Sequence, residues 1–367
     1  MKEPSANLKI VLDTSAKLRE AKSKEIQFSA PILIQNGNAV IFPHTINVIQ
    51  GQAGVHKSRL AETICAAILK KEECWKELLG YKVLSAKYNV VYVDTERNLA
   101  EQYPYALQSI QVKAGYYRSD HPENFDYISL LQIARKERYT TLNEYLQHLR
   151  VSTSEPLFIV LDVSTDCIED FNKSDKSMEL IDLMNVAINE HNVIFLCLIH
   201  ENPKSDKARG HFGTELMNKA STVMQVAFEK DGEQSETDII KVRYLKCRST
   251  ARHTPFYMKY DEIEKGLVLA SESEISDVMN YRKQKAPNDI LIEHIEMYLG
   301  DGTVMPRIEL LNKLGKDFKA VQRTIETRLL EIANHDFSNE NGQLCKLVKR
   351  NGEGKAKKSK FYCLEVS

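Results

Sequence analysis

The fold class of this chain is decided by residues 46–58, which read INVIQGQAGVHKS. An apolar run leads into a loop with two glycines, and Lys57 and Ser58 then open a segment of helical periodicity that extends to Lys70. A strand, a glycine-bearing loop, Lys-Ser and a helix in this order are typical of a P-loop, whose backbone N–H groups and helix N-terminus bind phosphate. The pattern predicts that Lys57 reaches the β- and γ-phosphates of ATP and that the Ser58 hydroxyl binds Mg²⁺.

One position departs from the P-loop pattern GxxxxGK[ST], because His56 stands where the last glycine is expected. Its Cβ either crowds the loop or restricts φ, and its side chain equally offers phosphate a further contact. A Lys-Ser pair that follows a turn by chance is the remaining alternative. The predicted nucleotide-binding residues are Gly51, Gln52, Ala53, Gly54, Val55, His56, Lys57, Ser58 and Arg59.

Two acidic strand ends complete the predicted site. The apolar run Pro156–Asp162 ends in a carboxylate, as a Walker B strand does, so we expect Asp162 to join Ser58 in binding Mg²⁺. The run Asn89–Asp94 is followed closely by Glu96, which we expect to orient and deprotonate the attacking water. The alternative for Glu96 is a solvated glutamate at the end of a strand.

A further strand, over Asn192–Ile199, is followed by His200. We expect this histidine to lie beside the γ-phosphate and to pass changes there to the next loop, although a purely structural histidine remains possible. That loop carries Lys204, Lys207 and Arg209, which fit the backbone of a nucleic acid. An ordinary charged surface loop is the alternative.

Lys246 and Arg248 follow the apolar residues of a late strand. Their spacing puts both cations on one side of the ribbon. If that strand lies at the far edge of the sheet, the two side chains reach a neighbouring subunit's nucleotide more easily than their own. They then stabilise developing phosphate charge, and the alternative is a pair of ordinary strand-edge cations.

Composition narrows the classes of protein that remain. The chain has 367 residues, of which 43% are hydrophobic and 28% charged, so it can bury a sizeable core. Its formal net charge is -1, so a nucleic-acid partner must be met by a local basic patch. No apolar run approaches the roughly 18 residues of a membrane span. The 7 cysteines form no CxxC pair, which favours reduced thiols and a cytoplasmic location.

Between about residues 39 and 270, short apolar runs alternate with helical patterns. This alternation predicts an α/β fold with a mainly parallel sheet that is buried on both faces. The last two runs, Ile239–Leu245 and Phe256–Tyr260, have no helix between them and predict antiparallel additions at one edge. The predicted organisation is an N-terminal extension over 1–30, a core over 31–270, a linker or a helix that ends in one over 271–288, and a small C-terminal domain over 289–367.

The C-terminal domain reads as three helices followed by two strands, which is the order of a winged helix-turn-helix. Its third helix, predicted to begin at Lys319, would enter the major groove of duplex DNA. Protein–protein contact is the other common use of this module. The predicted DNA-binding residues are Gln322, Arg323 and Thr327 in the helix and Lys355, Lys357 and Lys358 in the wing.

Taken together, residues 30–262 resemble the RecA-like ATPase core, specifically its RepA-like and DnaB-type hexameric helicase branch. Asp94-Thr-Glu96 resembles the catalytic glutamate segment of that family, and Asp162 resembles its Walker B aspartate. His200 is similar to the residue that closes its fourth motif, and Lys246 and Arg248 are similar to its trans-acting Lys-x-Arg. ATPases of bacterial plasmids and mobilizable elements are a looser likeness. The DnaB-type N-terminal domain is missing.

The resemblance implies hydrolysis of ATP with Mg²⁺ between adjacent subunits of a homo-oligomeric ring or filament, with single-stranded DNA held by central loops. The first hypothesis is therefore a DNA-linked, helicase-like ATPase that acts in replication, recombination or mobilisation of DNA. The alternative is a non-hydrolysing, nucleotide-sensing protein that binds DNA through its winged helix. Glu96 and the pair Lys246 and Arg248 favour the first hypothesis, and His56 favours the second.

Overall fold

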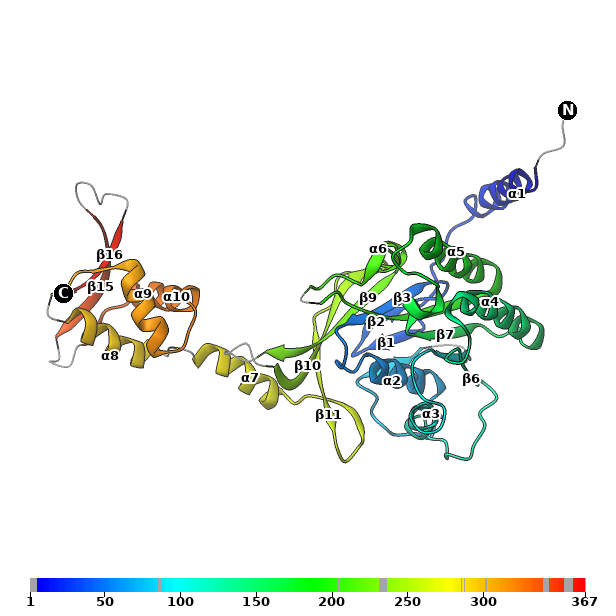
Figure 1. The fold of residues 1–367 in the computed structure, drawn as a ribbon, viewed down its shortest axis with the longest axis horizontal. Helices are drawn as coiled ribbons and strands as arrows, with labels where there is room; N and C mark the ends of the chain where they lie inside the picture. The colour runs from blue at the N-terminus through cyan, green and yellow to red at the C-terminus, as the bar shows by residue number, and fades with distance from the viewer. Residues whose placement is uncertain are drawn as a thin grey trace. The chain divides into compact units, whose positions relative to one another are not determined.

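A nine-stranded sheet forms the centre of the computed structural model, in the order β12-β11-β10-β9-β3-β8-β7-β5-β6 (Figure 1). The structure describes residues 5–84, 87–203, 205–230, 236–284, 286, 288–300, 302–338, 343–352 and 359–366. The strands are β3 (Ile46–Gly51), β5 (Asn89–Asp94), β6 (Phe125–Ser129), β7 (Leu157–Asp162), β8 (Val193–His200), β9 (Thr222–Lys230), β10 (Glu236–Cys247), β11 (Phe256–Asp261) and β12 (Gly266–Leu269).

Six neighbouring strands of this sheet are parallel. The pairs β6–β5, β5–β7, β7–β8, β8–β3 and β3–β9 all run in the same direction, whereas β11 and β12 pair antiparallel. The α/β class and the mainly parallel sheet that the sequence predicts are therefore confirmed. β10 and β11 lie beyond β9 in the strand order, at the end of the sheet where the sequence predicts late additions.

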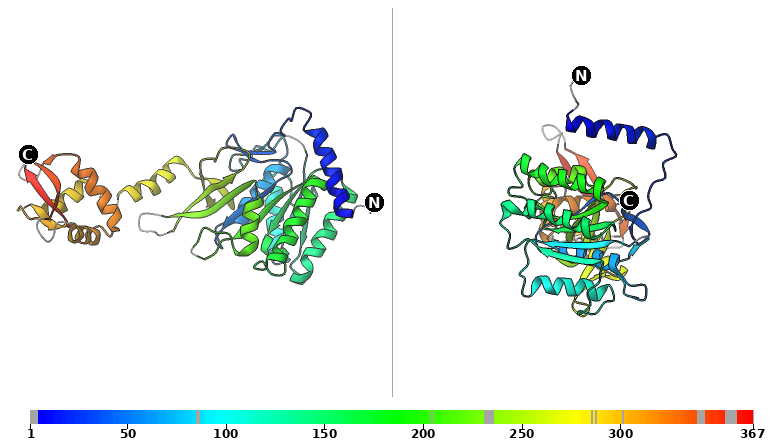
Figure 2. Two further views of the ribbon diagram at one scale, coloured as in Figure 1. Left: turned by 90° about the horizontal axis from the view of Figure 1, so that it is seen from above. Right: turned by 90° about the vertical axis from the view of Figure 1, so that its right-hand side faces the viewer.

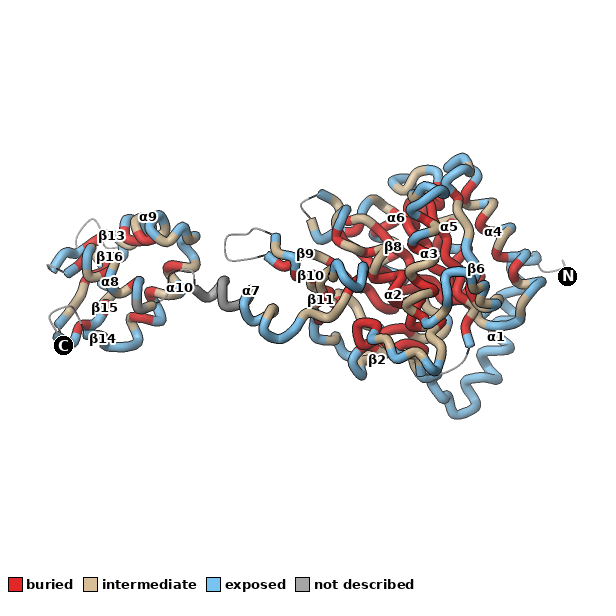
Figure 3. Tube along the Cα trace, turned by 90° about the horizontal axis from the view of Figure 1, so that it is seen from below, coloured by how far each residue is buried: buried red, intermediate tan, exposed pale blue. Residues whose placement is uncertain are grey.

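The parallel strands β3, β5, β7 and β8 are buried on both faces, which is why they read as nearly continuous apolar runs. Val91, Val93 and Ile159 belong to one buried cluster with helices α4 (Arg135–Ser152), α5 (Ser174–His191) and α6 (Gly210–Lys219). Helices α2 (Lys57–Leu69) and α3 (Gln102–Lys113) cover the other face (Figure 2). Figure 3 shows the buried residues concentrated along the strands between these two helical layers.

The register of the parallel strands aligns their C-terminal ends. Asp94 of β5 pairs with Asp162 of β7, and Gly51 of β3 pairs with His200 of β8. Because these residues end their strands, the segments that follow them meet along the C-terminal ends of the strands, which we call one edge of the sheet here. The residues predicted from four separate strand ends are brought to the same edge in this way.

Two helices lie outside the main sheet and its covering helices. Helix α1 (Ala6–Ala21) has no buried residue, and helix α7 (Glu272–Gln284) occupies most of residues 271–288, where the sequence leaves open a linker or a helix that ends in one. A three-stranded sheet combines β2 (Asn38–Ile41), β1 (Leu33–Gln35) and β4 (Tyr81–Val83). Among the helices that the described residues form, none has the length and apolar composition of a membrane span.

The C-terminal residues have a core of their own. Helices α8 (Asn288–Leu299), α9 (Arg307–Asp317) and α10 (Gln322–Ala333) pack around buried side chains that include Leu311, Ile325 and Tyr362. They accompany a sheet in the order β13-β16-β15-β14. Its strands are β13 (Met305–Pro306), β14 (Phe337–Ser338), β15 (Leu344–Asn351) and β16 (Lys360–Val366). The designation as a winged helix stays a prediction.

Helix α10 begins three residues later than the sequence predicts. Lys319 adopts φ 45, in the left-handed region, and therefore cannot continue a right-handed helix toward the N-terminus.

By its contacts the chain divides into two compact units, residues 1–226 with 242–255 and residues 227–241 with 256–367. The predicted boundaries at 30, 270 and 288 stay predictions.

Candidate functional site

The P-loop segment joins β3 to α2 through a loop with two left-handed residues. Gly54 has φ 82 and His56 has φ 65, and His56 is the N-cap of α2. A Cβ on Gly51 would overlap the carbonyl oxygen of Val226, so only glycine fits there. His56 thus takes the backbone conformation that a glycine adopts most easily, and burial, with Arg59 nearby, lowers its pKa. Ala53 and Gly54 lie exposed at the tip of the loop, and Val55 is buried.

Lys57 points back into the loop. Its Nζ donates to the carbonyl oxygens of Gly51 at 3.0 Å and Gln52 at 2.6 Å, and lies 3.3 Å from Nδ1 of His200. Burial lowers the pKa of Lys57, while the carboxylates of Asp162 and Glu96 oppose that shift. The ammonium group is held where the loop carbonyls converge, beside the end of β8.

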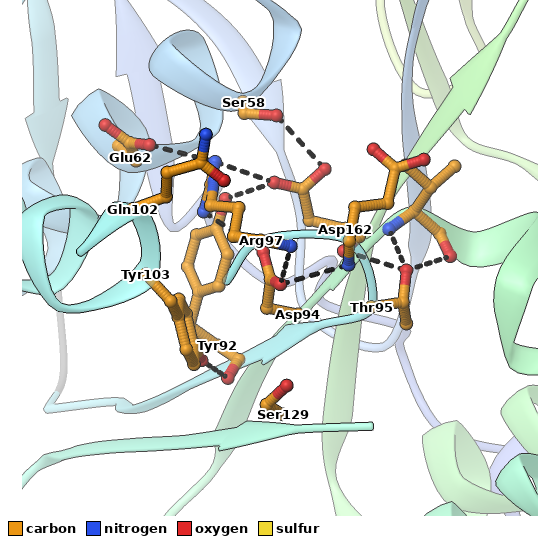
Figure 4. Close-up of polar contacts among 12 residues, drawn as sticks. Ser58, Glu62, Tyr92, Asp94, Thr95, Arg97, Gln102, Tyr103, Ser129 and Asp162 are labelled. Atoms are coloured by element: carbon orange, nitrogen blue, oxygen red, sulfur yellow. Dashed lines mark hydrogen bonds and ion pairs between the residues drawn. The ribbon is translucent and has the colours of Figure 1, made fainter. Parts of the chain in front are cut away.

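The two predicted Mg²⁺ ligands lie in contact. Ser58 Oγ donates to Asp162 Oδ1 at 3.1 Å (Figure 4). The second oxygen, Oδ2, accepts from the Tyr92 hydroxyl at 2.8 Å and from Arg97 Nη2 at 3.0 Å. A serine hydroxyl beside a carboxylate at the end of a strand is a donor set that fits Mg²⁺, which prefers oxygen ligands.

Arg97 was not predicted and is the central cation of a buried acidic cluster. It forms ion pairs with Glu62 at 3.0 Å, Asp94 at 3.3 Å and Asp162 at 3.0 Å (Figure 4). Burial raises the pKa of Glu62, and it raises that of Asp94 to about 6. The only sequence signals are an arginine directly after Glu96 and an acidic residue in the apolar part of α2.

Glu96 and His200 face each other across the sheet edge. Glu96 Oε1 lies 3.8 Å from His200 Nε2. The contact with His200 lowers the pKa of Glu96, and burial acts in the opposite direction. Because His200 Nδ1 lies near Lys57, the three side chains form a continuous row of polar groups.

Beside this row the structure has a hollow of about 470 Å³. Its lining includes Ser58, Arg59, Glu62, Glu96 and Arg97. The Arg59 guanidinium also stacks over the Tyr105 ring, 5.4 Å from its centre. The hollow is therefore open to a ligand that reaches Ser58, one of the two predicted Mg²⁺ ligands, and Glu96.

The predicted nucleic-acid loop follows His200. Lys207 and Arg209 line a hollow of about 410 Å³ together with Phe171 and Asn202. The Arg209 guanidinium lies over the Phe171 ring, 5.3 Å from its centre. Two of the three predicted cations thus share one hollow, and Lys204 lies outside the described residues.

Lys246 and Arg248 meet at the C-terminal end of α6. Lys246 Nζ donates to the carbonyl oxygens of Met217 at 2.8 Å and Asn218 at 3.0 Å, and Arg248 Nη2 donates to that of Asn218 at 2.8 Å. Burial lowers the pKa of Lys246, and Arg248 adds to that effect. Both cations lie on one side of the strand, as the spacing predicts, and these contacts join them to a helix terminus.

In the C-terminal unit, Gln322, Arg323 and Thr327 are exposed on the first turns of α10. Gln322 Nε2 donates to Asn312 Oδ1 at 2.6 Å, and Thr327 Oγ1 donates to the carbonyl oxygen of Arg323 at 2.9 Å. The three predicted wing lysines, Lys355, Lys357 and Lys358, lie outside the described residues.

Similarity to known proteins is found among solved structures. No protein-family model matches the chain, and no curated protein matches its sequence. The crystal structure of the RadB recombinase is similar to part of the chain, with a TM-score of 0.43 and 14% sequence identity, over 62% of this chain and 92% of that one. The score and the identity are low, and the match by itself identifies neither the family nor the activity of this chain.

Proposed function

We propose that this protein is a Mg²⁺-dependent, RecA-like ATPase whose hydrolysis of ATP is linked to DNA. The observation that carries the proposal is the meeting of Lys57, Ser58, Glu96, Asp162 and His200 at one edge of a parallel sheet. These five residues come from four separate segments of the chain, since Lys57 and Ser58 are adjacent, and each has a side chain that suits phosphoryl transfer from ATP at its position.

The proposed roles follow from the contacts. Lys57 holds the β- and γ-phosphates, and Ser58 with Asp162 holds Mg²⁺, which supplies charge neutralisation when bound. The contact with His200 lowers the pKa of Glu96 and so favours its carboxylate form, which accepts a proton from the attacking water. His200 lies between Lys57 and Glu96, and it responds to a γ-phosphate that lies beside these two side chains.

We further propose that the active site is completed between subunits. Lys246 and Arg248 donate to the C-terminal carbonyls of α6, at the end of a helix that begins beyond the predicted nucleic-acid loop. In a homo-oligomeric ring or filament, these cations then face the nucleotide of the next subunit. There they stabilise charge on the transferring phosphoryl group.

The proposed DNA contacts are of two kinds. Lys204, Lys207 and Arg209 hold the backbone of single-stranded DNA, and the hollow that Lys207 and Arg209 share with the Phe171 ring supports this role. A C-terminal winged helix binds duplex DNA through Gln322, Arg323 and Thr327, with the wing lysines 355, 357 and 358. This organisation suits a helicase-like motor of the RepA-like and DnaB-type branch, in replication, recombination or mobilisation of DNA.

The proposal is tested by phosphate release from ATP. The purified chain is assayed with Mg²⁺ or with EDTA, and with or without single-stranded DNA. We expect hydrolysis only with Mg²⁺, and a higher rate when single-stranded DNA is added. Hydrolysis that single-stranded DNA leaves unchanged would reject the link to DNA, and an absence of hydrolysis under every condition would reject the enzyme.

A second candidate function is a nucleotide sensor that binds ATP without hydrolysing it. The observation that favours it is His56, which has φ 65 in a loop where glycine adopts this conformation at lower cost. In that case ATP binds at Lys57 and alters DNA binding elsewhere. His56→Gly discriminates between the two candidates, since a gain of hydrolysis in this variant alone would identify the native chain as a sensor.

A further inference from the structure

A buried carboxylate lies directly under the predicted nucleic-acid loop. Glu201 follows His200 at the end of β8, and only 5% of it is exposed. Its Oε1 accepts hydrogen bonds from the side-chain amides of Gln50 at 2.7 Å and Gln225 at 2.5 Å. A carboxylate is costly to bury without such donors, so the two amides define its place.

These hydrogen bonds tie the loop to the strand that leads into the P-loop. Gln50 immediately precedes Gly51, and its Nε2 also donates to the carbonyl oxygen of Asp206 at 2.8 Å. On the other side, Arg243 of β10 donates from Nε to Gln225 Oε1 and from Nη2 to Asp206 Oδ2, each at 2.9 Å. The loop is therefore held from three successive strands of the sheet, β3, β9 and β10.

The P-loop itself makes two further contacts with the same loop. The backbone N–H of Glu201 donates to the Gly51 carbonyl at 3.1 Å, and Gln52 Nε2 donates to the Asn202 carbonyl at 2.9 Å. The carbonyls of Gly51 and Gln52 are also the acceptors of Lys57 Nζ. One pair of P-loop residues thus contacts the phosphate-binding lysine and the basic loop.

The loop is joined across its base, so its parts are coupled. Asn202 N–H donates to the Lys207 carbonyl, and Arg209 N–H donates to the His200 carbonyl, each at 2.9 Å. Glu201 and Ala208 form an antiparallel bridge. A displacement at Asn202 is therefore transmitted directly to the backbone of Lys207 and Arg209.

We propose that Glu201 is a positioning residue that fastens loop 201–209 to the P-loop, so that nucleotide bound at Lys57 sets the conformation of the loop. This inference rests on the proposed function in one respect, because it needs a nucleotide at the P-loop. When Lys57 Nζ turns toward phosphate, the carbonyls of Gly51 and Gln52 lose the hydrogen bonds that they accept from it. Those residues contact Glu201 and Asn202, so the change reaches the loop at its base.

Two substitutions at this position separate hydrogen bonding from charge. Both amides donate to the same oxygen of Glu201, so Glu201→Gln keeps a carbonyl acceptor where Oε1 lies and removes only the charge. Glu201→Ala removes the acceptor and leaves two buried amides without it. The exposed Glu190 at the end of α5 provides a control, Glu190→Gln.

The test is hydrogen exchange of the full-length protein, followed by mass spectrometry on peptides that cover residues 202–209. It is run without nucleotide and with Mg²⁺ and a slowly hydrolysed ATP analogue. Without nucleotide, Glu201→Ala should accelerate exchange in this loop about tenfold, which corresponds to about 1.4 kcal/mol of local stability, with β5 and β7 unchanged. The analogue should change loop exchange in the native chain and in Glu201→Gln, but not in Glu201→Ala.

Each outcome bears on the proposal. Loop exchange in Glu201→Ala that stays within about twofold of native, in both states, would overturn the positioning role. Acceleration spread equally over β5 and β7 would also overturn it, because that pattern signals a general structural role. If fluorescent ATP fails to bind the native chain, the proposed function fails and the link to nucleotide falls with it, and the nucleotide-free arm still decides whether Glu201 positions the loop.

Discussion

The P-loop edge of the sheet and the exposed face of α10 hold their candidate residues in opposite ways. Lys57 and Asp162 are 6% and 4% exposed, and each contacts groups from other elements. Gln322, Arg323 and Thr327 are exposed, and the contacts of Gln322 and Thr327 stay within α9 and α10. Residues of the first region are held by contacts between elements of the fold, whereas those of the second lie exposed.

This difference has a consequence for substitutions. A residue at the C-terminal ends of the parallel strands supports its neighbours, and by our proposal it also binds ATP or Mg²⁺, so its loss changes the geometry of the whole site. An exposed residue on α10 affects only the contact that it makes with a partner. We therefore expect large effects on activity in the first region and small, separable effects on DNA affinity in the second.

The largest effect is expected from Lys57→Ala. The change removes the Nζ that donates to the carbonyls of Gly51 and Gln52, and with it the charge that we propose faces the β- and γ-phosphates. Binding of a fluorescent ATP analogue, measured by anisotropy, should be lost, while the exposed control Lys87→Ala binds as the native chain does. If Lys57→Ala bound the ATP analogue with the native affinity, the expected difference in the effects of substitutions between the two regions would be contradicted.

The next effect concerns Arg248. If it acts on the nucleotide of a neighbouring subunit, Arg248→Ala should bind ATP normally and hydrolyse it about 10³-fold more slowly. The exposed Arg252→Ala is the control. Mixing Arg248→Ala with Lys57→Ala should partly restore phosphate release, because some interfaces then pair an intact P-loop with an intact arginine. A failure of rescue, with assembly verified by sedimentation, would assign Arg248 a role within its own subunit.

The smallest effect is expected in the exposed region. Arg323→Ala should weaken binding to duplex DNA by about tenfold and leave ATP hydrolysis unchanged, since an exposed cation contributes about 1–3 kcal/mol to such contacts. Titrations at several salt concentrations measure the effect, with the exposed Lys316→Ala on α9 as the control. Equal affinities of the native chain, Arg323→Ala and Lys316→Ala would argue that α10 binds protein rather than DNA.

The sequence predicts best the elements whose local pattern and burial agree. β5 has the predicted bounds, Asn89–Asp94, and α2 ends within one residue of its predicted end, because the interior of β5 is an apolar run and most residues of α2 are buried. α3 was missed because Pro104 and scattered polar residues obscure its periodicity, although proline is tolerated in a first helical turn. β6 was missed because it lies at the sheet edge with Asp126 and Tyr127 exposed.

Side-chain contacts between segments that lie far apart in the chain could not be predicted from the sequence. Arg97 meets Glu62 and Asp162 only because α2, β5 and β7 are brought together by the fold. Likewise Glu201 meets Gln50 across 151 residues of chain, through the register of β3 and β8. A motif can propose residues at strand ends, but the partner of each buried charge depends on strand order, which no local pattern contains.

The central claim is that the P-loop edge is a site of ATP hydrolysis and not merely of binding. Its most direct test is a single turnover of bound radiolabelled ATP in the presence of Mg²⁺, comparing the native chain with Glu96→Gln and with the exposed control Glu101→Gln. We expect the native chain and the control to convert bound ATP to ADP and phosphate. Glu96→Gln should bind as much ATP and convert it about 10²–10⁴-fold more slowly, because its amide accepts no proton. Conversion by Glu96→Gln at the native rate would contradict the role of Glu96, and unconverted ATP on the native chain would contradict hydrolysis at this site.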